Sequence, residues 1–190
     1  MPKTFLQLKN EVQQITPSDP SVGDFINDAL VDIIKSSRRS RKNSYTVTDG
    51  GVTIPTDCLF VRKVAWEGVP LNLYPGEETP VLGTGRPLYW QQTETHIMLY
   101  PTPSLDAGGK VEIIYCPRPA ELVSDTDVPT LTGIDTALIA YAKWKIYTKK
   151  EDTVAADIWR AEYAYEKLNW LELDMLQQKR TWRINVGSYS

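Results

Sequence analysis

The chain has 190 residues, of which 42% are hydrophobic and 24% charged, and its formal net charge is −3. This composition is typical of one compact soluble domain, which usually has roughly 100 to 200 residues. No apolar run approaches the roughly 20 residues that a membrane span needs, and residues 1–4 lack the apolar centre of a signal peptide. We therefore expect no membrane segment and a protein made and kept in a cytosol. Cys58 and Cys116 are expected to be small buried hydrophobes rather than a bridge or a metal pair.

The first 43 residues carry two helical patterns. Apolar residues three or four positions apart predict a short helix that starts near Phe5 and ends before Pro17. A second helix is predicted after Ser18-Asp19-Pro20, where a capping residue and a first-turn proline precede an apolar stripe from Val22 to Ile34. We expect these two helices to pack as a pair.

Residues 44–117 alternate between apolar and polar, which predicts strands rather than helices. The clearest strand patterns cover residues 85–90, 97–103 and 111–117. A hairpin is predicted around Asp49-Gly50-Gly51, because glycine accepts a positive φ. The glycine- and proline-rich segment from Tyr74 to Arg86 is longer than most loops, so we expect it to contact a partner.

After an irregular return over residues 118–132, helical patterns resume. One helix begins near Ile134, and a longer one is predicted from about Thr153 to Gln178. The predicted fold class is therefore α+β: a mainly helical bundle with an inserted antiparallel β module. A single domain is expected over residues 1–178, with its helices in 1–43 and 133–178 and its strands in 44–117.

The last predicted helix carries two apolar seams, and a helix that is apolar nearly all round is normally buried on more than one side. It is either the central helix of its own domain, or its second seam faces another subunit. The small chain, with its 6 Trp and 10 Tyr, favours a partner, because these residue types are enriched at interfaces. One seam comprises Ile158, Ala161, Tyr165, Leu168 and Met175. The other, which we predict as the partner surface, comprises Trp159, Tyr163, Trp170 and Leu173.

Residues 179–190 show no continued helical stripe and instead alternate like a strand. Such a tail is either frayed or a segment that adds itself to the edge of another chain's sheet. Its apolar content favours docking, so we predict an extended docking tail. The predicted contact residues are Arg180, Trp182, Ile184, Val186 and Tyr189.

Groups able to perform chemistry are scarce in this chain. His96 is the sole histidine, which excludes zinc sites that need two or three histidines. Paired acids occur at Glu77-Glu78, at Asp125 with Asp127 and at Glu151-Asp152, but loop and helix-start roles explain them without catalysis. We predict no catalytic residue, no metal and no cofactor.

A basic run interrupts the otherwise acidic chain, with five positive charges in eight residues: Lys35, Arg38, Arg39, Arg41 and Lys42. Such a cluster can neutralise phosphates, face solvent, or dock an acidic protein surface. No motif for sequence-specific DNA reading accompanies it. Nonspecific contact with DNA stays open.

The order of several short segments carries a family resemblance. These segments are Phe25–Ala29, Val52–Asp57, Val64–Leu71, Gly85–Tyr89, Ile97–Pro103, Ile113–Tyr115 and a closing helix pair with Ala155, Ala156 and Tyr163. The set, spread over about residues 5 to 175, resembles the head-to-tail adaptor proteins of tailed bacteriophages, also called connector or neck proteins. The basic run departs from the pattern of that family.

The resemblance implies a structural, non-enzymatic protein of the virion neck, made in the host cytoplasm. It implies a dodecameric ring beneath the portal that joins the capsid vertex to the tail and leaves a channel for the genome. The implied partners are the portal protein, tail or nozzle proteins, further copies of this chain and, nonspecifically, the packaged DNA. Two alternatives stay open: a nonspecific DNA-binding module that uses residues 35–42, and a tail-associated cell-wall hydrolase.

Overall fold

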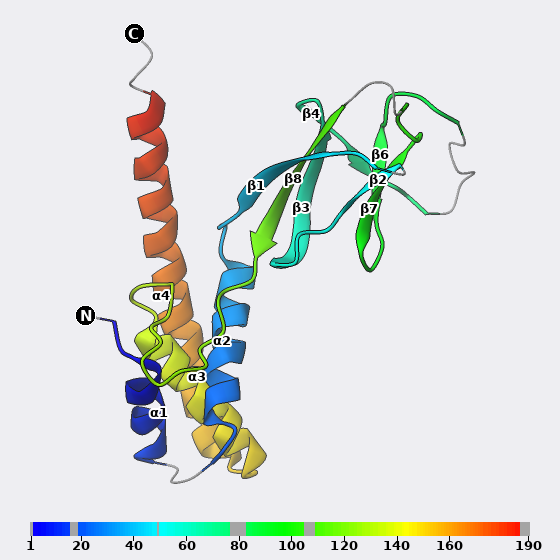
Figure 1. Ribbon diagram of the computed structural model, residues 1–190. Coiled ribbons are helices and arrows are strands. Elements are labelled where there is room, and N and C mark those ends of the chain that lie inside the picture. Colours follow the sequence, from blue (N-terminus) through cyan, green and yellow to red (C-terminus); the bar gives the residue numbers. More distant parts are fainter. Residues whose placement is uncertain (1, 16–18, 49, 77–82, 105–108, 187–190) are drawn as a thin grey trace. The chain divides into compact units, whose positions relative to one another are not determined.

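The computed structural model describes residues 2–15, 19–48, 50–76, 83–104 and 109–186, with only the backbone described for residues 178–186. Four helices and eight strands make an α+β fold, which confirms the predicted class (Figure 1). The chain divides into two compact units. Unit 1 joins residues 1–38 to residues 119–190 and holds the helices; unit 2, residues 39–118, holds the strands.

Unit 1 begins with α1 (Phe5–Gln13) and α2 (Val22–Ser36), close to the predicted pair. A capping box opens α1: the Thr4 hydroxyl accepts the Gln7 N–H, and the Gln7 side chain accepts the Thr4 N–H. The predicted stripe of α2 is buried at Val22, Ile26 and Ile33, among others. The apolar stripes therefore form the core of unit 1.

The boundary between helix and strand lies earlier than the predicted residue 43. Helix α2 ends at Ser36, because Ser37 turns to an extended backbone and its hydroxyl donates to the Ile34 carbonyl at 2.8 Å. The first strand, β1 (Arg41–Thr46), begins inside the basic run. The charges of that run hid this strand, since alternation is hard to see where most side chains are polar.

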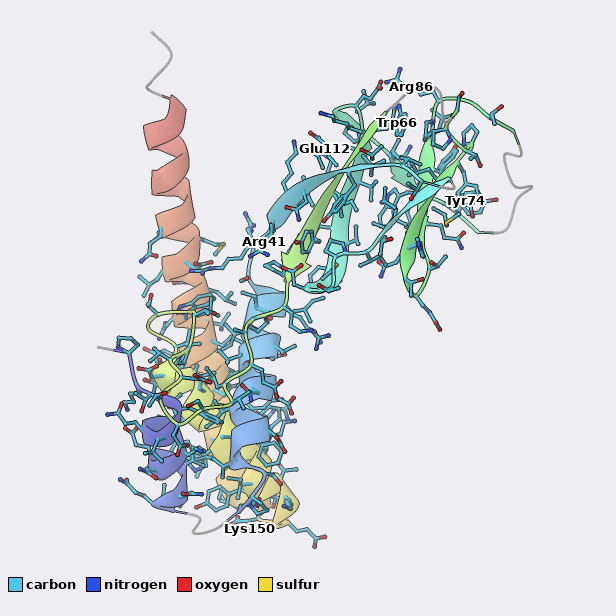
Figure 2. All side chains as sticks on the ribbon, in the orientation of Figure 1. Arg41, Trp66, Tyr74, Arg86, Glu112 and Lys150 are labelled. Carbon is cyan, nitrogen blue, oxygen red and sulfur yellow. The ribbon has the colours of Figure 1, made fainter. Side chains whose placement is uncertain are left out.

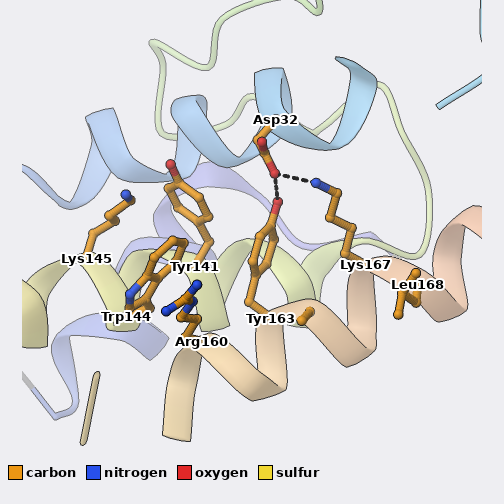
Figure 3. Close-up of a pocket in the computed structure, with 9 residues that line it drawn as sticks. Asp32, Tyr141, Trp144, Lys145, Arg160, Tyr163, Lys167 and Leu168 are labelled. Atoms are coloured by element: carbon orange, nitrogen blue, oxygen red, sulfur yellow. Dashed lines mark hydrogen bonds and ion pairs between the residues drawn. The ribbon is translucent and has the colours of Figure 1, made fainter. Parts of the chain in front are cut away.

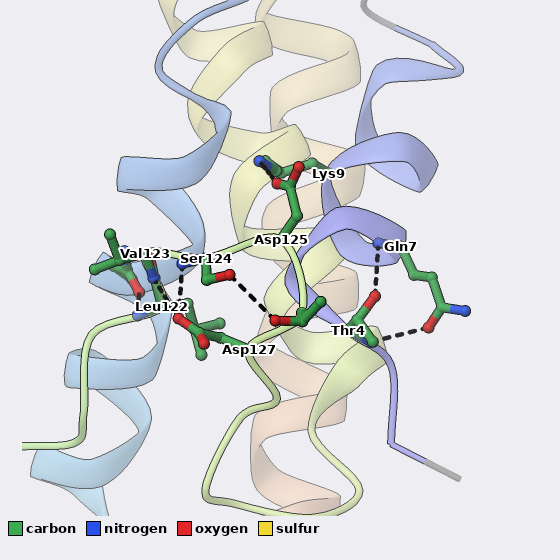
Figure 4. A network of polar contacts seen from close by, with 10 residues as sticks. Thr4, Gln7, Lys9, Leu122, Val123, Ser124, Asp125 and Asp127 are labelled. Atoms are coloured by element: carbon green, nitrogen blue, oxygen red, sulfur yellow. Dashed lines mark hydrogen bonds and ion pairs between the residues drawn. The ribbon is translucent and has the colours of Figure 1, made fainter.

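The return segment of residues 119–134 is fixed against α1 by hydrogen bonds (Figure 4). The N–H of Phe5 donates to the Asp127 carbonyl at 2.7 Å, and the N–H of Leu6 donates to the Asp125 carbonyl at 3.1 Å. The Lys9 ammonium also pairs with the Asp125 carboxylate at 2.6 Å. These contacts give partners to the first N–H groups of α1, which have none within the helix.

The second half of unit 1 consists of α3 (Asp135–Lys149) and α4 (Thr153–Val186). The long helix continues eight residues beyond the predicted end at Gln178, so the expectation of an extended tail is wrong for residues 179–186. No glycine or proline occurs between Thr153 and Val186, so nothing in the chain stops the helix. Residues 187–190, including Tyr189, lie outside the described part of the chain.

Unit 2 contains two four-stranded sheets, ordered β1-β8-β3-β4 and β2-β7-β6-β5. Beyond β1, the strands are β2 (Gly51–Thr53), β3 (Cys58–Trp66), β4 (Val69–Pro70), β5 (Asn72–Leu73), β6 (Tyr89–Gln92), β7 (His96–Tyr100) and β8 (Lys110–Pro117). Most pairs are antiparallel, but β5 and β6 are parallel. Inward side chains of both sheets share one core, for example Val64 and Ile113 with Trp90 and Leu99.

The predicted hairpin around Asp49-Gly50-Gly51 forms only as a tight turn. Thr48 and Gly51 exchange hydrogen bonds of 2.9 and 3.0 Å, and Gly50 has the expected positive φ of 79°. Beyond the turn the two strands separate, because β1 pairs with β8 and β2 pairs with β7. The turn therefore connects the two sheets instead of joining neighbouring strands.

Gly109 allows the side chain of Trp66 to lie close against the backbone, so Gly109→Ala is expected to destabilise unit 2. An added Cβ would lie 2.0 Å from a Trp66 ring carbon, and Trp66 is only 4% exposed. Overpacking of this kind costs about 1–3 kcal/mol. Urea unfolding measures the loss. Gly85→Ala is the matched control, because the nearest neighbour of its added Cβ, a Pro101 side-chain carbon, would lie at an ordinary 3.8 Å. An equal loss in both variants would contradict the proposed overpacking.

Candidate functional site

Helix α4 has two apolar faces, and only one of them is buried. Ala156, Tyr163 and Trp170 are each 6–7% exposed and pack inside unit 1. Five large apolar side chains lie on the opposite face and form what we call the α4 stripe: Val154, Ile158, Tyr165, Leu168 and Leu176, which are 56–71% exposed. The helix therefore presents several large apolar side chains on the face opposite its buried one.

This arrangement corrects the predicted partner seam. Tyr163 and Trp170 belong to the core of unit 1: Trp170 Nε1–H donates to the Thr132 carbonyl at 3.0 Å, and Tyr163 donates to Asp32. Trp159 is half-buried, with the Lys143 ammonium 4.3 Å from its ring centre, and only Leu173 is exposed, beside the stripe. The other predicted seam, with Ile158, Tyr165 and Leu168, is the one left uncovered.

A pocket of about 540 Å³ opens between α2, α3 and α4, next to this stripe (Figure 3). Three aromatic rings form its apolar wall. The Tyr141 ring lies 5.3 Å from the Trp144 ring and 5.0 Å from the Tyr163 ring, both edge to face. Leu168 lines the pocket and also belongs to the α4 stripe, so the two features are continuous.

Three cationic side chains surround the aromatic wall. The Lys145 ammonium lies 4.2 Å from the Trp144 ring centre, and the Arg160 guanidinium lies 5.9 Å from it. The Lys167 ammonium pairs with the Asp32 carboxylate at 2.6 Å. Aromatic faces attract cations, so these rings hold the positive charges near the pocket opening. The sequence patterns did not single out Trp144, because it lies in α3 whereas Arg160 lies in α4.

Asp32 joins α2 to α4 at the edge of the pocket. Burial opposes ionisation of its carboxyl group, but hydrogen bonds from Lys167 and Tyr163 outweigh burial, so the pKa of Asp32 lies below its usual value of 3.8. Burial, and then the hydrogen bond to Asp32, raise the pKa of Tyr163, which stays protonated as the donor. The pair therefore acts as a polar anchor between the two helices.

Asp32→Asn is expected to lower the free energy of unfolding by about 1–3 kcal/mol at neutral pH, because Lys167 and Tyr163 lose a charged acceptor. Since folding lowers the pKa of Asp32, its contribution is complete above the unfolded value of 3.8 and is lost as the pH falls through the folded pKa. Urea titrations of both proteins across the acid range measure this. The variant should lose less stability in acid than the wild type, and the exposed Asp28→Asn should behave like the wild type. Parallel acid curves for wild type and Asp32→Asn would contradict the anchor.

The predicted basic run does not lie on one element. Lys35 lies near the end of α2, whereas Arg41 and Lys42 lie in β1 of unit 2. The Arg41 guanidinium pairs with Asp57 at 2.5 Å, and the Lys42 ammonium pairs with Glu112 at 2.8 Å (Figure 2). At least two of the five charges therefore have carboxylate partners within unit 2, which weakens the case for a phosphate-binding cluster.

The paired acids have structural roles where the structure describes them. Asp127 accepts the N–H groups of Val123 and Ser124 at 2.8 and 2.7 Å, and these bonds lower its pKa (Figure 4). Asp152 accepts the Ala155 N–H at 3.0 Å at the start of α4. Glu77 and Glu78 lie outside the described residues, as do residues 79–82 of the predicted contact loop. Among the described residues, no group of three or more His, Cys, Asp or Glu could hold a metal ion.

Comparison with known families decides what kind of protein this is. The sequence profile of the SU10 adaptor protein family matches residues 3–186, nearly the whole chain. The chain belongs to the SU10 adaptor protein family. This confirms the resemblance to phage head-to-tail adaptors and makes the protein a structural component of a phage virion.

No curated protein matches the sequence of this SU10 adaptor. Across the part of the chain that the structure describes, no helix is long and apolar enough to cross a membrane. On α4 of this family member, exposed apolar side chains and the aromatic pocket lie side by side.

Proposed function

We propose that this SU10 adaptor forms a dodecameric ring beneath the portal, links the capsid vertex to the tail, and leaves a channel for the genome. The α4 stripe is the observation that carries the proposal. Five large apolar side chains on one face of a helix, opposite its buried face, are unusual for a protein that works alone. Burial of this stripe against further virion subunits would remove the apolar surface from water.

The described contacts support a role carried by surfaces rather than by chemistry. Of the paired acids, Asp127 and Asp152 accept backbone N–H groups in the return segment and at the start of α4. Exposed aliphatic side chains and a large aromatic ring are suited to a dry contact between proteins. In this proposal the portal protein, tail or nozzle proteins and further copies of the chain cover the α4 stripe.

The C-terminal segment is the second proposed contact. Residues 180–186 continue α4 as helix, so in this proposal Arg180, Trp182, Ile184 and Val186 dock from a helix rather than as an added strand. Tyr189 would extend this contact. The segment would reach the portal or a tail protein.

Complementation of phage that lack this protein tests the proposed function. Without the protein we expect filled heads and separate tails, and addition of the purified chain should restore joined particles. A chain that ends at Lys179 should fold but fail to restore them. Tailed, infectious particles formed in the absence of the protein would overturn the proposal, and full activity of the shortened chain would remove the C-terminal segment from it.

A further inference from the structure

The pocket on unit 1 is suited to a ligand that is both aromatic and acidic. Its wall consists of Tyr141, Trp144 and Tyr163, and Lys145 and Arg160 lie within cation–π distance of Trp144. Its one lining acid, Asp32, already accepts from Tyr163 and Lys167. A volume of about 540 Å³ is ample for an aromatic side chain and within the size range of protein ligand pockets.

The same chain carries such a group on the other side of α4. Tyr165 is 62% exposed, and Glu162 is exposed one turn before it. Residues three apart on a helix are neighbours, so the ring and the carboxylate form a single projection. We call Glu162 and Tyr165 the α4 knob.

We propose that the pocket of one subunit receives the α4 knob of a second copy of this chain. The Tyr165 ring would pack among the three pocket rings, where edge-to-face contacts are favourable. The Glu162 carboxylate would meet Lys145 and Arg160, which balances the charge of the pocket. The inference rests on the proposed ring and names the contact that builds it.

The placement of pocket and knob around α4 requires two different subunits. Each helical residue advances by about 100°, so Tyr165 lies about 140° and Glu162 about 160° around the axis from Arg160. A knob therefore cannot reach the pocket of its own helix. Pocket and knob are different surfaces, so their contact is head-to-tail: each added subunit leaves one free pocket and one free knob, as ring closure requires.

Two variants separate the two surfaces. The pocket variant carries Lys145→Gln and Arg160→Gln, and the knob variant carries Glu162→Gln and Tyr165→Ser. None of these side chains is buried, so both variants should fold. Loss of an interface hot spot typically weakens binding about thirtyfold or more, so each variant alone should self-associate at least about thirtyfold more weakly than the wild type.

Mixing the two variants gives the decisive result. The knob variant retains an intact pocket and the pocket variant retains an intact knob, so sedimentation velocity should show a one-to-one dimer that grows no further. Matched controls are Lys150→Glu at the exposed end of α3 and Val123→Ser in the return segment, which should associate like the wild type.

Three results would overturn the inference. They are unchanged self-association of the pocket variant, a mixture that contains no heterodimer, and wild-type protein that stays monomeric at every concentration. The inference would also be overturned if the pocket variant no longer attached to portal-bearing heads but self-associated like the wild type. The pocket would then bind another virion protein. These failures leave the proposed adaptor function standing, since that function is tested separately by complementation with the wild-type chain.

Discussion

Trp170→Ala is expected to lower the free energy of unfolding of the helical unit by about 3–5 kcal/mol, the usual cost of truncating a buried tryptophan. Trp170 is 6% exposed on the buried face of α4, and its indole N–H donates to the Thr132 carbonyl at 3.0 Å. The truncation would leave a cavity and deprive that carbonyl of a donor. Urea unfolding followed by circular dichroism at the helical wavelength measures the loss.

Leu173→Ala is the matched control for this prediction. Leu173 lies one turn after Trp170 and is 60% exposed, so its truncation should change the free energy of unfolding by no more than about 0.5 kcal/mol. A large loss at Leu173 together with a small one at Trp170 would mean that the two faces of α4 have been assigned the wrong way round.

The double variant Ile158→Ser, Leu176→Ser is expected to keep the wild-type melting temperature yet to reduce the restoration of tailed particles at least about a hundredfold. Both side chains belong to the α4 stripe, are 62% and 56% exposed, and lie outside the lining of the pocket. Each truncated hot spot costs about 2 kcal/mol or more of binding, and about 2.7 kcal/mol already corresponds to a hundredfold. Infectivity after complementation measures the loss.

Val123→Ser, Val128→Ser provides the control for the stripe variant. It removes the same number of exposed apolar side chains from the return segment of unit 1, where they are 76% and 41% exposed. This control should restore particles as well as the wild type. Equal activity of both double variants would show that the α4 stripe is not a contact surface, and a lowered melting temperature of the stripe variant would place it in the core.

Local patterns predicted the helices that have one apolar face and the strands that alternate clearly. The stripe of α2 from Val22 to Ile34 has one apolar face, and that face is buried. The alternation in residues 97–103 and 111–117 likewise predicted β7 and β8. In these segments the period of the side chains decides both the type of element and the face that is buried.

Long-range pairing was beyond local patterns. The tight turn at Gly50 predicted a hairpin, but β1 pairs with β8 and β2 pairs with β7, whose residues lie roughly 70 and 45 positions further along the chain. Alternation in residues 182–186 predicted a strand, although the absence of glycine and proline lets α4 continue. A pattern of five residues is too short to outweigh the continuation of a helix that has already formed.

The candidate site could be identified only from the tertiary structure. Periodicity found both seams of α4, but only the contacts with Asp32 and Thr132 show that the seam of Tyr163 and Trp170 is the inner one. The pocket was missed because its rings and cations come from two helices, α3 and α4, and its acid, Asp32, comes from α2, far away in the sequence. Neither feature leaves a signature in a single stretch of residues.

An electron-microscopy reconstruction of the virion neck tests the central claim most directly. The account predicts a closed ring of copies of this SU10 adaptor between the portal and the tail, with the α4 stripe covered by neighbouring protein. A reconstruction that shows the protein elsewhere in the virion, or a ring in which Ile158, Tyr165 and Leu176 remain open to solvent, would contradict it.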